Sequence, residues 1–271
     1  MPELPEVETV RLGLTKLNGW QIQDTELLLP RIFKSEIPLS QINNFKISNI
    51  QRRGKFLWFE FDQPFHLICH LGMSGRFLLN PDNPRHPRVK LILAKGQKIK
   101  TLIYDDQRTF GWLKLEPRNN SIPKSVSHIA LDPFDSKFNS KAVINTMQSR
   151  KATIKSLLLN QSIMSGVGNI YADESLWMAK IHPNTPGDKL STDQLRLLIQ
   201  SVKKVMQKAL AKGGTSFDAL YVNINGDSGF FEISLKAYGQ DGKPCSRCGS
   251  LIKAIKFGAR HSHFCPKCQK K

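Results

Sequence analysis

The sequence predicts an α+β protein with several domains: an N-terminal helix plus β-sandwich, then a helical domain that carries a small cysteine-rich module. Three observations support this class. Apolar residues recur at helical spacing near the start, alternate in short runs between 56 and 115, and return to helical spacing from about 153. Four of the five cysteines stand in two pairs near the C-terminus. A chain of 271 residues is also long for one compact core.

The N-terminal residues predict one amphipathic helix followed by a sandwich or barrel. Pro5 suits a first helical turn, and Glu6 and Glu8 favour a helix N-terminus. The apolar face of this helix consists of Val7, Val10, Leu14 and Leu17. Short apolar or alternating runs bounded by Gly, Pro, Asn and Asp then predict strands at 56–61, 66–71, 76–79, 89–93, 99–104 and 112–115.

The second half of the chain predicts helices. Residues 116–135 are rich in Pro, Ser and Asn and predict the exit toward a second domain. Segments 153–160 and 169–179 flank a Gly166-Val167-Gly168 turn, which is typical of a helix–turn–helix-like unit.

A longer helix follows this unit. Ser191 and Gln194 predict a capping box at its start, and Gly213 with Gly214 predicts its end. Residues 217–234 are weakly patterned and predict a loop. We therefore expect domains at 1–135 and 136–234, and a module at 235–271.

The balance of charge restricts the class of partner. Forty Lys and Arg against 22 Asp and Glu give a formal net charge of +18. Such a charge attracts nucleic acid or an anionic membrane surface, although a generally basic protein remains the alternative. No apolar run approaches the ~20 residues that span a bilayer, and the start of the chain is acidic where a signal peptide is basic. We expect a cytosolic protein, in which Cys69 is a small buried hydrophobe.

The C-terminal cysteines predict a structural zinc site. Cys245 and Cys248 form one CxxC pair, and after sixteen intervening residues Cys265 and Cys268 form another. Two such pairs complete the tetrahedral shell that Zn²⁺ prefers, so the nearby His261 is not needed as a ligand. Two disulfides or a redox-active pair are the alternatives, and the cytosolic context favours zinc. The module is basic, which suits contact with phosphate.

The N-terminal proline offers a nucleophile. If Met1 is removed, Pro2 exposes a secondary α-amine, whose pKa of about 7.7–8.0 leaves an appreciable neutral fraction at physiological pH. Attack on a sugar C1′ would give an iminium ion that acidifies the C2′ proton. Glu3 and Glu6 are the adjacent groups for acid–base chemistry and positioning. A capped helix entrance is the alternative interpretation.

The sequence resembles the formamidopyrimidine-DNA glycosylase family along nearly its whole length. The N-terminal motif is Pro2-Glu3-Leu4-Pro5-Glu6, and Leu4 favours this purine-directed branch over the sister family, endonuclease VIII, which typically has Gly there. The other motifs fall in family order: Arg52-Arg53-Gly54-Lys55, His70-Leu71-Gly72-Met73-Ser74-Gly75, Arg108-Thr109-Phe110-Gly111, Gly166-Val167-Gly168-Asn169-Ile170-Tyr171 and the zinc finger Cys245–Cys268.

The resemblance implies catalytic roles for four residues. Pro2 would form the Schiff base, and Glu3 would act as the acid in ring opening and base loss. Lys55 would act in β-elimination; without the family it would be interpreted as the solvated start of a strand. Arg260 would act in δ-elimination, with a simple phosphate contact as its alternative.

The resemblance also implies a DNA interface. His86, Arg108 and Arg150 match residues that contact DNA, and Asn169 would hold phosphate at the start of a helix in a helix–two-turn–helix motif. Met73, Arg108 and Phe110 would fill the gap left by a flipped nucleotide. By default Met73 and Phe110 would be core residues, Arg108 a surface charge and Asn169 a helix N-cap.

The chain departs from the family pattern at two places. The family commonly has His-Asp-His where this chain has His86-Pro87-Arg88, and Thr109 replaces a frequent basic residue. Thr109 therefore lacks a positive charge that would face the undamaged strand of the duplex.

These inferences predict a monomeric glycosylase and lyase that removes oxidised purines, such as 8-oxoguanine and formamidopyrimidines, from duplex DNA bound between two domains. Zinc would be structural. A zinc-ribbon regulator that binds DNA without catalysis is one alternative, but it does not explain the N-terminal Pro-Glu. A pyrimidine-directed glycosylase with the same architecture is the other.

Overall fold

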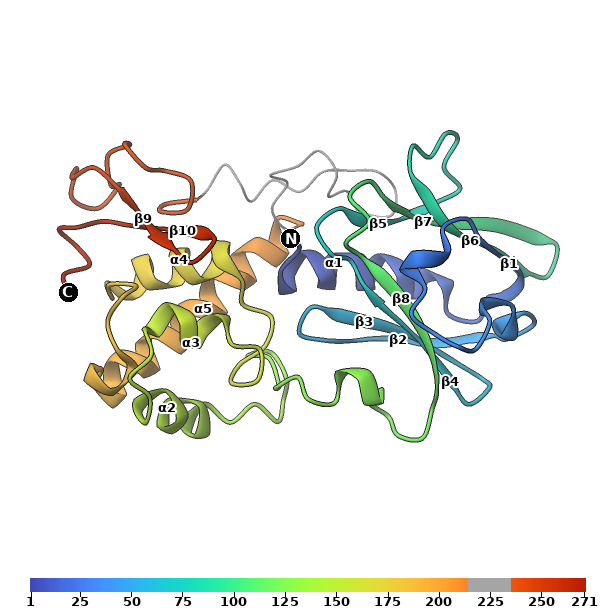
Figure 1. Ribbon diagram of the computed structural model, residues 1–271, viewed down its shortest axis with the longest axis horizontal. Helices are drawn as coiled ribbons and strands as arrows, with labels where there is room; N and C mark the ends of the chain where they lie inside the picture. The colour runs from blue at the N-terminus through green and yellow to red at the C-terminus, as the bar shows by residue number, and fades with distance from the viewer. Residues whose placement is uncertain (214–234) are drawn as a thin grey trace. The chain divides into compact units, whose positions relative to one another are not determined.

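Two antiparallel sheets make up most of the first half of the chain in the computed structural model, which describes residues 1–213 and 235–271 (Figure 1). Among these residues one sheet has the strand order β1-β6-β7-β5 and the other the order β2-β3-β4-β8. The strands are β1 Gln21–Leu27, β2 Ile47–Arg53, β3 Phe56–Phe61, β4 Phe65–His70, β5 Gly75–Leu79, β6 Pro87–Lys95, β7 Lys98–Asp106 and β8 Trp112–Pro117.

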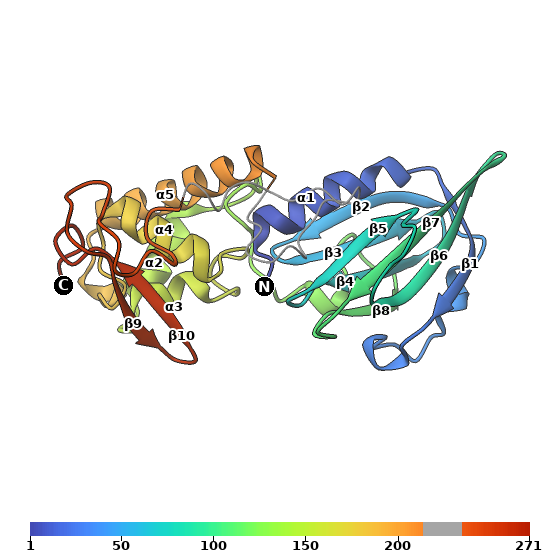
Figure 2. The same ribbon diagram turned by 90° about the horizontal axis from the view of Figure 1, so that it is seen from above.

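The two sheets share one apolar core, as a β-sandwich requires. Phe59 of β3 and Phe77 of β5 meet edge to face, with ring centroids 5.8 Å apart, although they belong to different sheets. Helix α1 (Leu4–Leu14) runs beside β2 and β3, as Figure 2 shows. The predicted apolar face of this helix is buried in the same core: Val7, Val10, Leu14 and Leu17. The sandwich and its helix are therefore confirmed.

Each predicted strand overlaps an observed one, but β1 and β2 were not predicted. In β2 a register shift between Ile47 and Asn49 breaks the pairing, so the buried Ile47 and Ile50 are three residues apart instead of two. In β1 a shift occurs after Ile22, which is the one fully buried side chain of that strand. Bulges of this kind remove the alternation on which strand prediction depends.

The second compact unit comprises Ile129–Ala211 together with 235–271, whereas the first comprises Met1–His128. The predicted helix–turn–helix-like unit and the long helix are present, and the capping box holds with Ser191 N donating to Gln194 Oε1 at 2.8 Å. The helices are α2 Ser140–Gln148, α3 Ile154–Leu159, α4 Asn169–Ala179 and α5 Thr192–Ala211. None of the described helices has the length and apolar character that a membrane crossing needs.

Helix α2 was not predicted, because it follows the Pro- and Asn-rich segment that indicated only a linker. Gly213, with φ +74°, follows the end of α5 as predicted. The predicted loop 217–234 lies outside the described residues. The predicted division into 1–135, 136–234 and 235–271 stays a prediction.

The C-terminal module contains a hairpin that is attached to α4 by buried charge. Its strands are β9 (Lys253–Phe257) and β10 (Arg260–Phe264). Asp173 of α4 accepts hydrogen bonds from Lys155 Nζ at 2.6 Å, from Ser262 Oγ at 3.0 Å and from His263 N at 2.8 Å. Lys155 and Asp173 are both fully buried. One carboxylate thus joins α3, α4 and β10.

The next residue of α4 holds the beginning of the module. Glu174 is buried, and its carboxylate accepts the backbone N–H groups of Lys236, Ala237 and Tyr238 at 2.7–3.0 Å. Burial raises the pKa of Glu174, and these hydrogen bonds oppose that rise. Two neighbouring carboxylates therefore attach two separate parts of the module to one helix.

We predict that Lys155→Met destabilises the protein by roughly 3–5 kcal/mol, because Asp173 would remain buried without its charge partner. Urea unfolding of the zinc-loaded protein measures the change. Arg196→Met is the matched control, since it removes the exposed ion pair with Asp193 of the same unit and should cost less than about 1 kcal/mol. Equal effects of the two substitutions would contradict a structural role for the buried pair.

Candidate active site and nucleic-acid interface

The N-terminus is held by the capping box of α1. Glu3 is the N-cap residue, and its backbone N–H donates to Glu6 Oε2 at 2.9 Å. Glu3 is 2% exposed and Glu6 is 6% exposed, and Pro2 is buried directly before them. The Glu6 carboxylate therefore accepts a hydrogen bond from the residue next to Pro2, and the start of α1 holds the backbone of Glu3 in place.

Met1 controls the chemistry of that nitrogen. While Met1 is attached, the Pro2 nitrogen belongs to a peptide bond, and resonance with the carbonyl group removes its nucleophilic character. Met1 is 41% exposed, so the bond that joins it to Pro2 lies at the surface end of a buried segment. Cleavage of this bond would create a secondary amine at the start of α1.

The predicted lysine lies on a turn that is attached to α1. Gly54 and Lys55 join β2 to β3, and Gly54 adopts a left-handed φ of +57°. Arg52 donates from Nη1 to Gly54 O and from Nε to Glu8 Oε2, both at 2.8 Å. Burial alone would raise the pKa of Glu8, but hydrogen bonds from Arg11 and Arg52 lower it overall. The ion pair thus holds the Lys55 turn against the helix that carries Pro2.

The structure adds His70 to this site. Its ring lies 4.8 Å from that of Phe56 and is stacked on Trp112 at 5.9 Å, measured between centroids. Burial lowers the pKa of His70 to about 4, and the charge of Lys55 contributes to this shift. Gly72 N donates to His70 Nδ1 at 3.2 Å, so Nε2 carries the proton of the neutral ring. In the sequence, His70 stands out only as part of a motif; the short connection at 62–64, which pairs β3 with β4, is the signal that places Phe56 opposite it.

A buried carboxylate joins the two turns that carry the predicted gap-filling residues. Asp106 accepts from Ser74 Oγ at 2.5 Å and from Gly111 N at 2.8 Å, and Ser74 Oγ in turn accepts from Arg108 N at 2.8 Å. The turns are in direct contact, since a Cβ on Gly72 would lie 2.3 Å from Gly111 N. The Met73 turn and the Arg108–Phe110 turn therefore form one rigid structure.

Exposure separates the two interpretations of Phe110. Its side chain is 61% exposed, so the default assignment of Phe110 to the core is wrong. Met73 is half-buried, and Arg108 is exposed. An aromatic side chain on a rigid turn in solvent has the form of a wedge that can enter a base step.

His86 belongs to the same end of the sandwich. Its N–H donates to Asp105 Oδ2 at 2.6 Å, and its carbonyl accepts from Asp106 N at 3.0 Å. Arg76 donates to the other oxygen of Asp105 at 3.1 Å. The half-buried His86 is therefore positioned through its backbone beside the strand end from which the Arg108–Phe110 turn begins.

The second unit brings Asn169 and Arg260 together. Asn169 Nδ2 donates to the carbonyl of His261 at 3.2 Å, and Lys155 Nζ donates to the same oxygen. Gly168 is the N-cap of α4, so the alternative that made Asn169 an N-cap is wrong. Arg260 is exposed at the start of β10, directly before His261. The predicted Arg150 is also exposed and lies just beyond the cap of α2.

The four cysteines of the module fit a zinc ion. The sulfur atoms of Cys245, Cys248, Cys265 and Cys268 all lie within 4.8 Å of one another. A tetrahedron with Zn–S distances of about 2.3 Å has sulfur–sulfur edges of roughly 3.8 Å, which this cluster can adopt. His263 Nδ1 lies 3.0 Å from Asp173 Oδ2 and is not part of the cluster. Four thiolates leave no open position for water or substrate.

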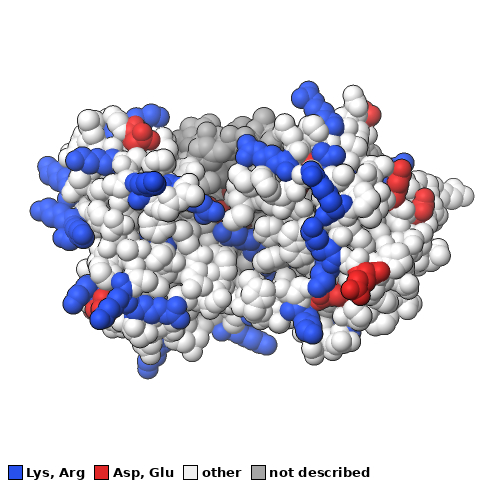
Figure 3. All heavy atoms as spheres, viewed as in Figure 1, with Lys and Arg blue, Asp and Glu red and all other residues white. Residues whose placement is uncertain are grey.

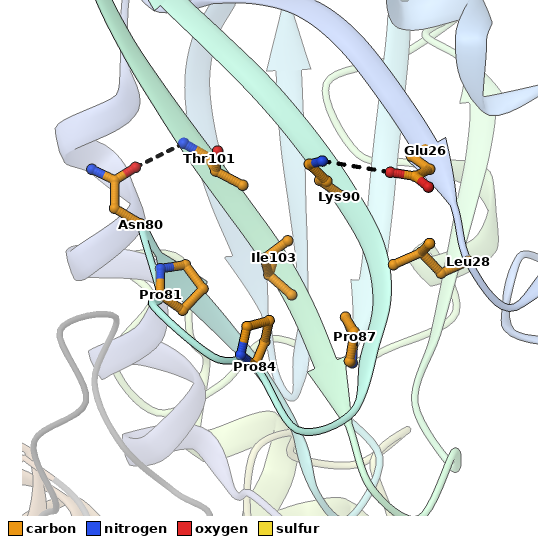
Figure 4. A pocket seen from close by; sticks show the side chains of 9 residues that line it. All are labelled: Glu26, Leu28, Asn80, Pro81, Pro84, Pro87, Lys90, Thr101 and Ile103. Carbon is orange, nitrogen blue, oxygen red and sulfur yellow. Dashed lines mark hydrogen bonds and ion pairs between the residues drawn. The ribbon is translucent and has the colours of Figure 1, made fainter.

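The molecular surface carries abundant positive charge. Figure 3 shows one face on which Lys and Arg side chains lie on both units, with several Asp and Glu side chains among them on the first unit. A hollow on the outer face of the sheet with β6 and β7 is a separate feature (Figure 4). Its lining includes three prolines and the Lys90–Glu26 ion pair, at 3.6 Å, and none of the predicted site residues. This hollow is therefore not the candidate site.

Three family models match the chain. They are the formamidopyrimidine-DNA glycosylase N-terminal domain at 1–113, the formamidopyrimidine-DNA glycosylase H2TH domain at 129–219, and a zinc finger found in FPG and IleRS at 242–271. Together with the cluster of four sulfur atoms, the third match confirms the predicted structural zinc site.

Relatives and solved structures agree with these matches. A formamidopyrimidine-DNA glycosylase of Corynebacterium glutamicum is 49% identical, with full coverage of both chains. One from a Nocardioides species is 44% identical over 99% of this chain and 94% of its own.

A Lactococcus lactis FPG mutant solved with Fapy-dG containing DNA is 38% identical and superimposes with a TM-score of 0.91 over both whole chains. The Lactococcus lactis Fpg with abasic site containing DNA gives 37% and 0.89, over 99% of this chain and 100% of that one. The predicted sandwich, helix–two-turn–helix domain and zinc finger are thereby confirmed.

We predict that Phe110→Ala changes the free energy of unfolding by less than about 1 kcal/mol, because the side chain is mostly in solvent. Phe77→Ala is the matched control, since Phe77 is 2% exposed in the core and should cost roughly 3–5 kcal/mol. Thermal unfolding compares the two variants, and binding to a duplex with an abasic site should fall for Phe110→Ala. A loss of stability as large as that of Phe77→Ala would return Phe110 to the core.

Proposed function

Because the chain belongs to the formamidopyrimidine-DNA glycosylase family, we propose that its substrate is duplex DNA with an oxidised purine, which it excises before cutting the strand. The observation that carries this proposal is the N-terminus: Pro2 stands directly before a buried capping box made by Glu3 and Glu6. A regulator that only binds DNA would not need a potential amine nucleophile beside two buried carboxylates.

In the first step of the proposed reaction, a bond from C1′ to the Pro2 nitrogen replaces the bond from C1′ to the base. The lone pair of the Pro2 nitrogen forms a bond to C1′, and the base leaves with the electrons of the glycosidic bond and takes up the proton that this nitrogen loses. Glu3 donates a proton to the ring oxygen O4′ as the sugar opens, which leaves an iminium ion between Pro2 and C1′. The capping box supports this assignment, because it holds Glu3 in one conformation next to the nitrogen.

Two eliminations then cut the strand. Loss of the C2′ proton expels the 3′ phosphate, and a second proton loss along the conjugated chain expels the 5′ phosphate. We assign Lys55 to the first elimination and Arg260 to the second. The charge of Lys55 acts on the neighbouring His70, whose neutral imidazole offers its Nε2–H as a hydrogen-bond donor. A phosphate could accept this hydrogen bond, which supports the assignment of Lys55 to a position near a phosphate.

The remaining predicted residues form the proposed DNA interface. Phe110, Met73 and Arg108 would occupy the gap left by the flipped nucleotide, and the bonds of Asp106 that join their two turns support this. Asn169, at the N-terminus of α4, would hold a phosphate together with the positive end of the helix. His86 and Arg150 would contact the DNA backbone. The zinc ion would act only by folding the hairpin that carries Arg260.

We assign the purine-directed activity over the pyrimidine-directed one, since each curated relative quoted above is named a formamidopyrimidine-DNA glycosylase. We infer a cytosolic location and action as a monomer, because the proposed substrate is chromosomal DNA and the proposed reaction needs residues of one chain only.

We predict that the enzyme is active only after removal of Met1. Protein with a free Pro2 should form a covalent adduct with damaged duplex when borohydride reduces the iminium ion, and mass spectrometry should locate the bond at Pro2. Protein that keeps an N-terminal extension should form none, because an amide nitrogen cannot form a Schiff base. Equal adduct formation by both proteins would refute the mechanism, and no adduct with either would favour the regulator.

We predict that Glu3→Gln lowers the rate of base excision by ~10²-fold or more while DNA affinity stays close to that of the wild type. Glutamine keeps an oxygen that can cap α1 but has no acidic proton, so the helix should still begin at Leu4. Glu26→Gln is the control, because it changes an exposed carboxylate that pairs with Lys90. Single-turnover kinetics measure the rate; normal excision by Glu3→Gln would exclude Glu3 as the acid.

A further inference from the structure

An arginine from a distant part of the sequence lies against the wedge turn. Arg31 Nη2 donates to Thr109 Oγ1 at 2.5 Å, although the two residues are 78 positions apart. Thr109 stands between the exposed Arg108 and the exposed Phe110. The guanidinium group of Arg31 is therefore part of the surface from which the wedge projects.

The backbone that carries Arg31 is fixed on both sides. Arg31 lies in the 3-10 turn Pro30–Ile32, and Ile32 is 1% exposed within the core of the sandwich. Directly after this turn, Phe33 forms a β-bridge with Leu113, and Lys34 N donates to Leu113 O at 2.7 Å. The turn is thus attached to β8 just beyond the wedge, and it presents Arg31 from a rigid base.

Thr109 has an unusual backbone conformation for its residue type. Its φ of +54° lies in the left-handed region, which β-branched residues rarely adopt because their side chains crowd the backbone. Hydrogen bonds from Arg108 N to Ser74 Oγ and from Gly111 N to Asp106 Oδ2 hold the chain on both sides of it. Strained backbone that its surroundings hold in place is often found at functional sites. Here it directs the Thr109 hydroxyl toward Arg31.

We propose that Arg31 binds a backbone phosphate of the duplex beside the base step that Phe110 enters, and that Thr109 is its positioning residue. This proposal rests on the proposed function. A guanidinium group has five N–H donors, so a hydrogen bond to Thr109 leaves others for the two oxygens of a phosphate. When Phe110 inserts between two stacked bases, the turn that carries Phe110 lies next to the backbone phosphates of that base step. The exposed charge next to Phe110 then meets one of them.

The test measures the affinity for a duplex with an abasic-site analogue between about 50 and 200 mM salt. Loss of one phosphate contact lowers the slope of log K against log salt concentration by ~0.9. Arg31→Ala should show this lower slope and a several-fold weaker affinity at low salt, and Arg31→Lys should restore the slope because it keeps the charge. Thr109→Val should keep the slope but weaken binding, since the charge remains and its orientation is lost.

Lys98→Ala is the matched control. It removes one exposed charge from the same unit, at the far end of β7, roughly 26 Å along the strand from Asp106, and should leave the slope unchanged. A slope for Arg31→Ala equal to that of the wild type would overturn the phosphate contact. Unchanged affinity of Thr109→Val would overturn the positioning role.

A separate measurement distinguishes these outcomes from failure of the proposed function. At saturating concentrations of abasic DNA, borohydride should trap Arg31→Ala to the same final yield as the wild type, because Arg31 takes no part in the chemistry. If the wild type itself forms no adduct, the proposed catalysis fails, while the comparison of salt slopes still decides whether Arg31 binds phosphate.

Discussion

The hydrogen bond between Glu3 N and Glu6 Oε2 is the constraint on which the candidate active site depends. A chain terminus is normally mobile, yet a nucleophile must be held close to the atom that it attacks. The capping box meets both requirements, because it orders the backbone at residue 3, directly after the residue that cleavage of Met1 would make the N-terminus. The apolar face of α1 is buried in the core of the sandwich, so the helix and the residues at its N-terminus are held in a fixed position.

Buried carboxylates perform a similar task elsewhere in the molecule. Asp106 joins the Met73 turn to the Phe110 turn, and Asp173 joins the hairpin of the zinc finger to α3 and α4. Removing one partner of such a group leaves a buried charge or acceptor unsatisfied, so each loop has one strongly favoured arrangement. The exposed Phe110 and Arg260 thus project from rigid supports, and less conformational entropy is lost when they bind DNA.

The sequence predicts the parts of this design that are local. Periodicity identified α1, α3, α4, α5 and six of the strands, and the spacing of the cysteines identified the zinc site. It did not identify β1 or β2, where bulges break the alternation, nor α2, which follows a segment rich in turn formers. The pairs Lys155–Asp173 and Arg31–Thr109 join residues far apart in the chain, and no local pattern predicts them. For Lys155–Asp173 the sequence offered one sign, because Asp173 is a charged residue in a helix whose other residues are largely apolar.

The two positions at which the chain departs from its family also differ in physical terms. At His86-Pro87-Arg88 the backbone of His86 is still held by Asp105 and Asp106, so the change affects side chains more than the path of the chain. At Thr109 a positive charge is missing from the wedge turn, but the hydroxyl that replaces it accepts a hydrogen bond from Arg31. A guanidinium group therefore still lies against the turn, and it is supplied by a separate element with its own anchors. The positive charge beside the turn thus depends on the contact with Arg31 as well as on the residue at position 109.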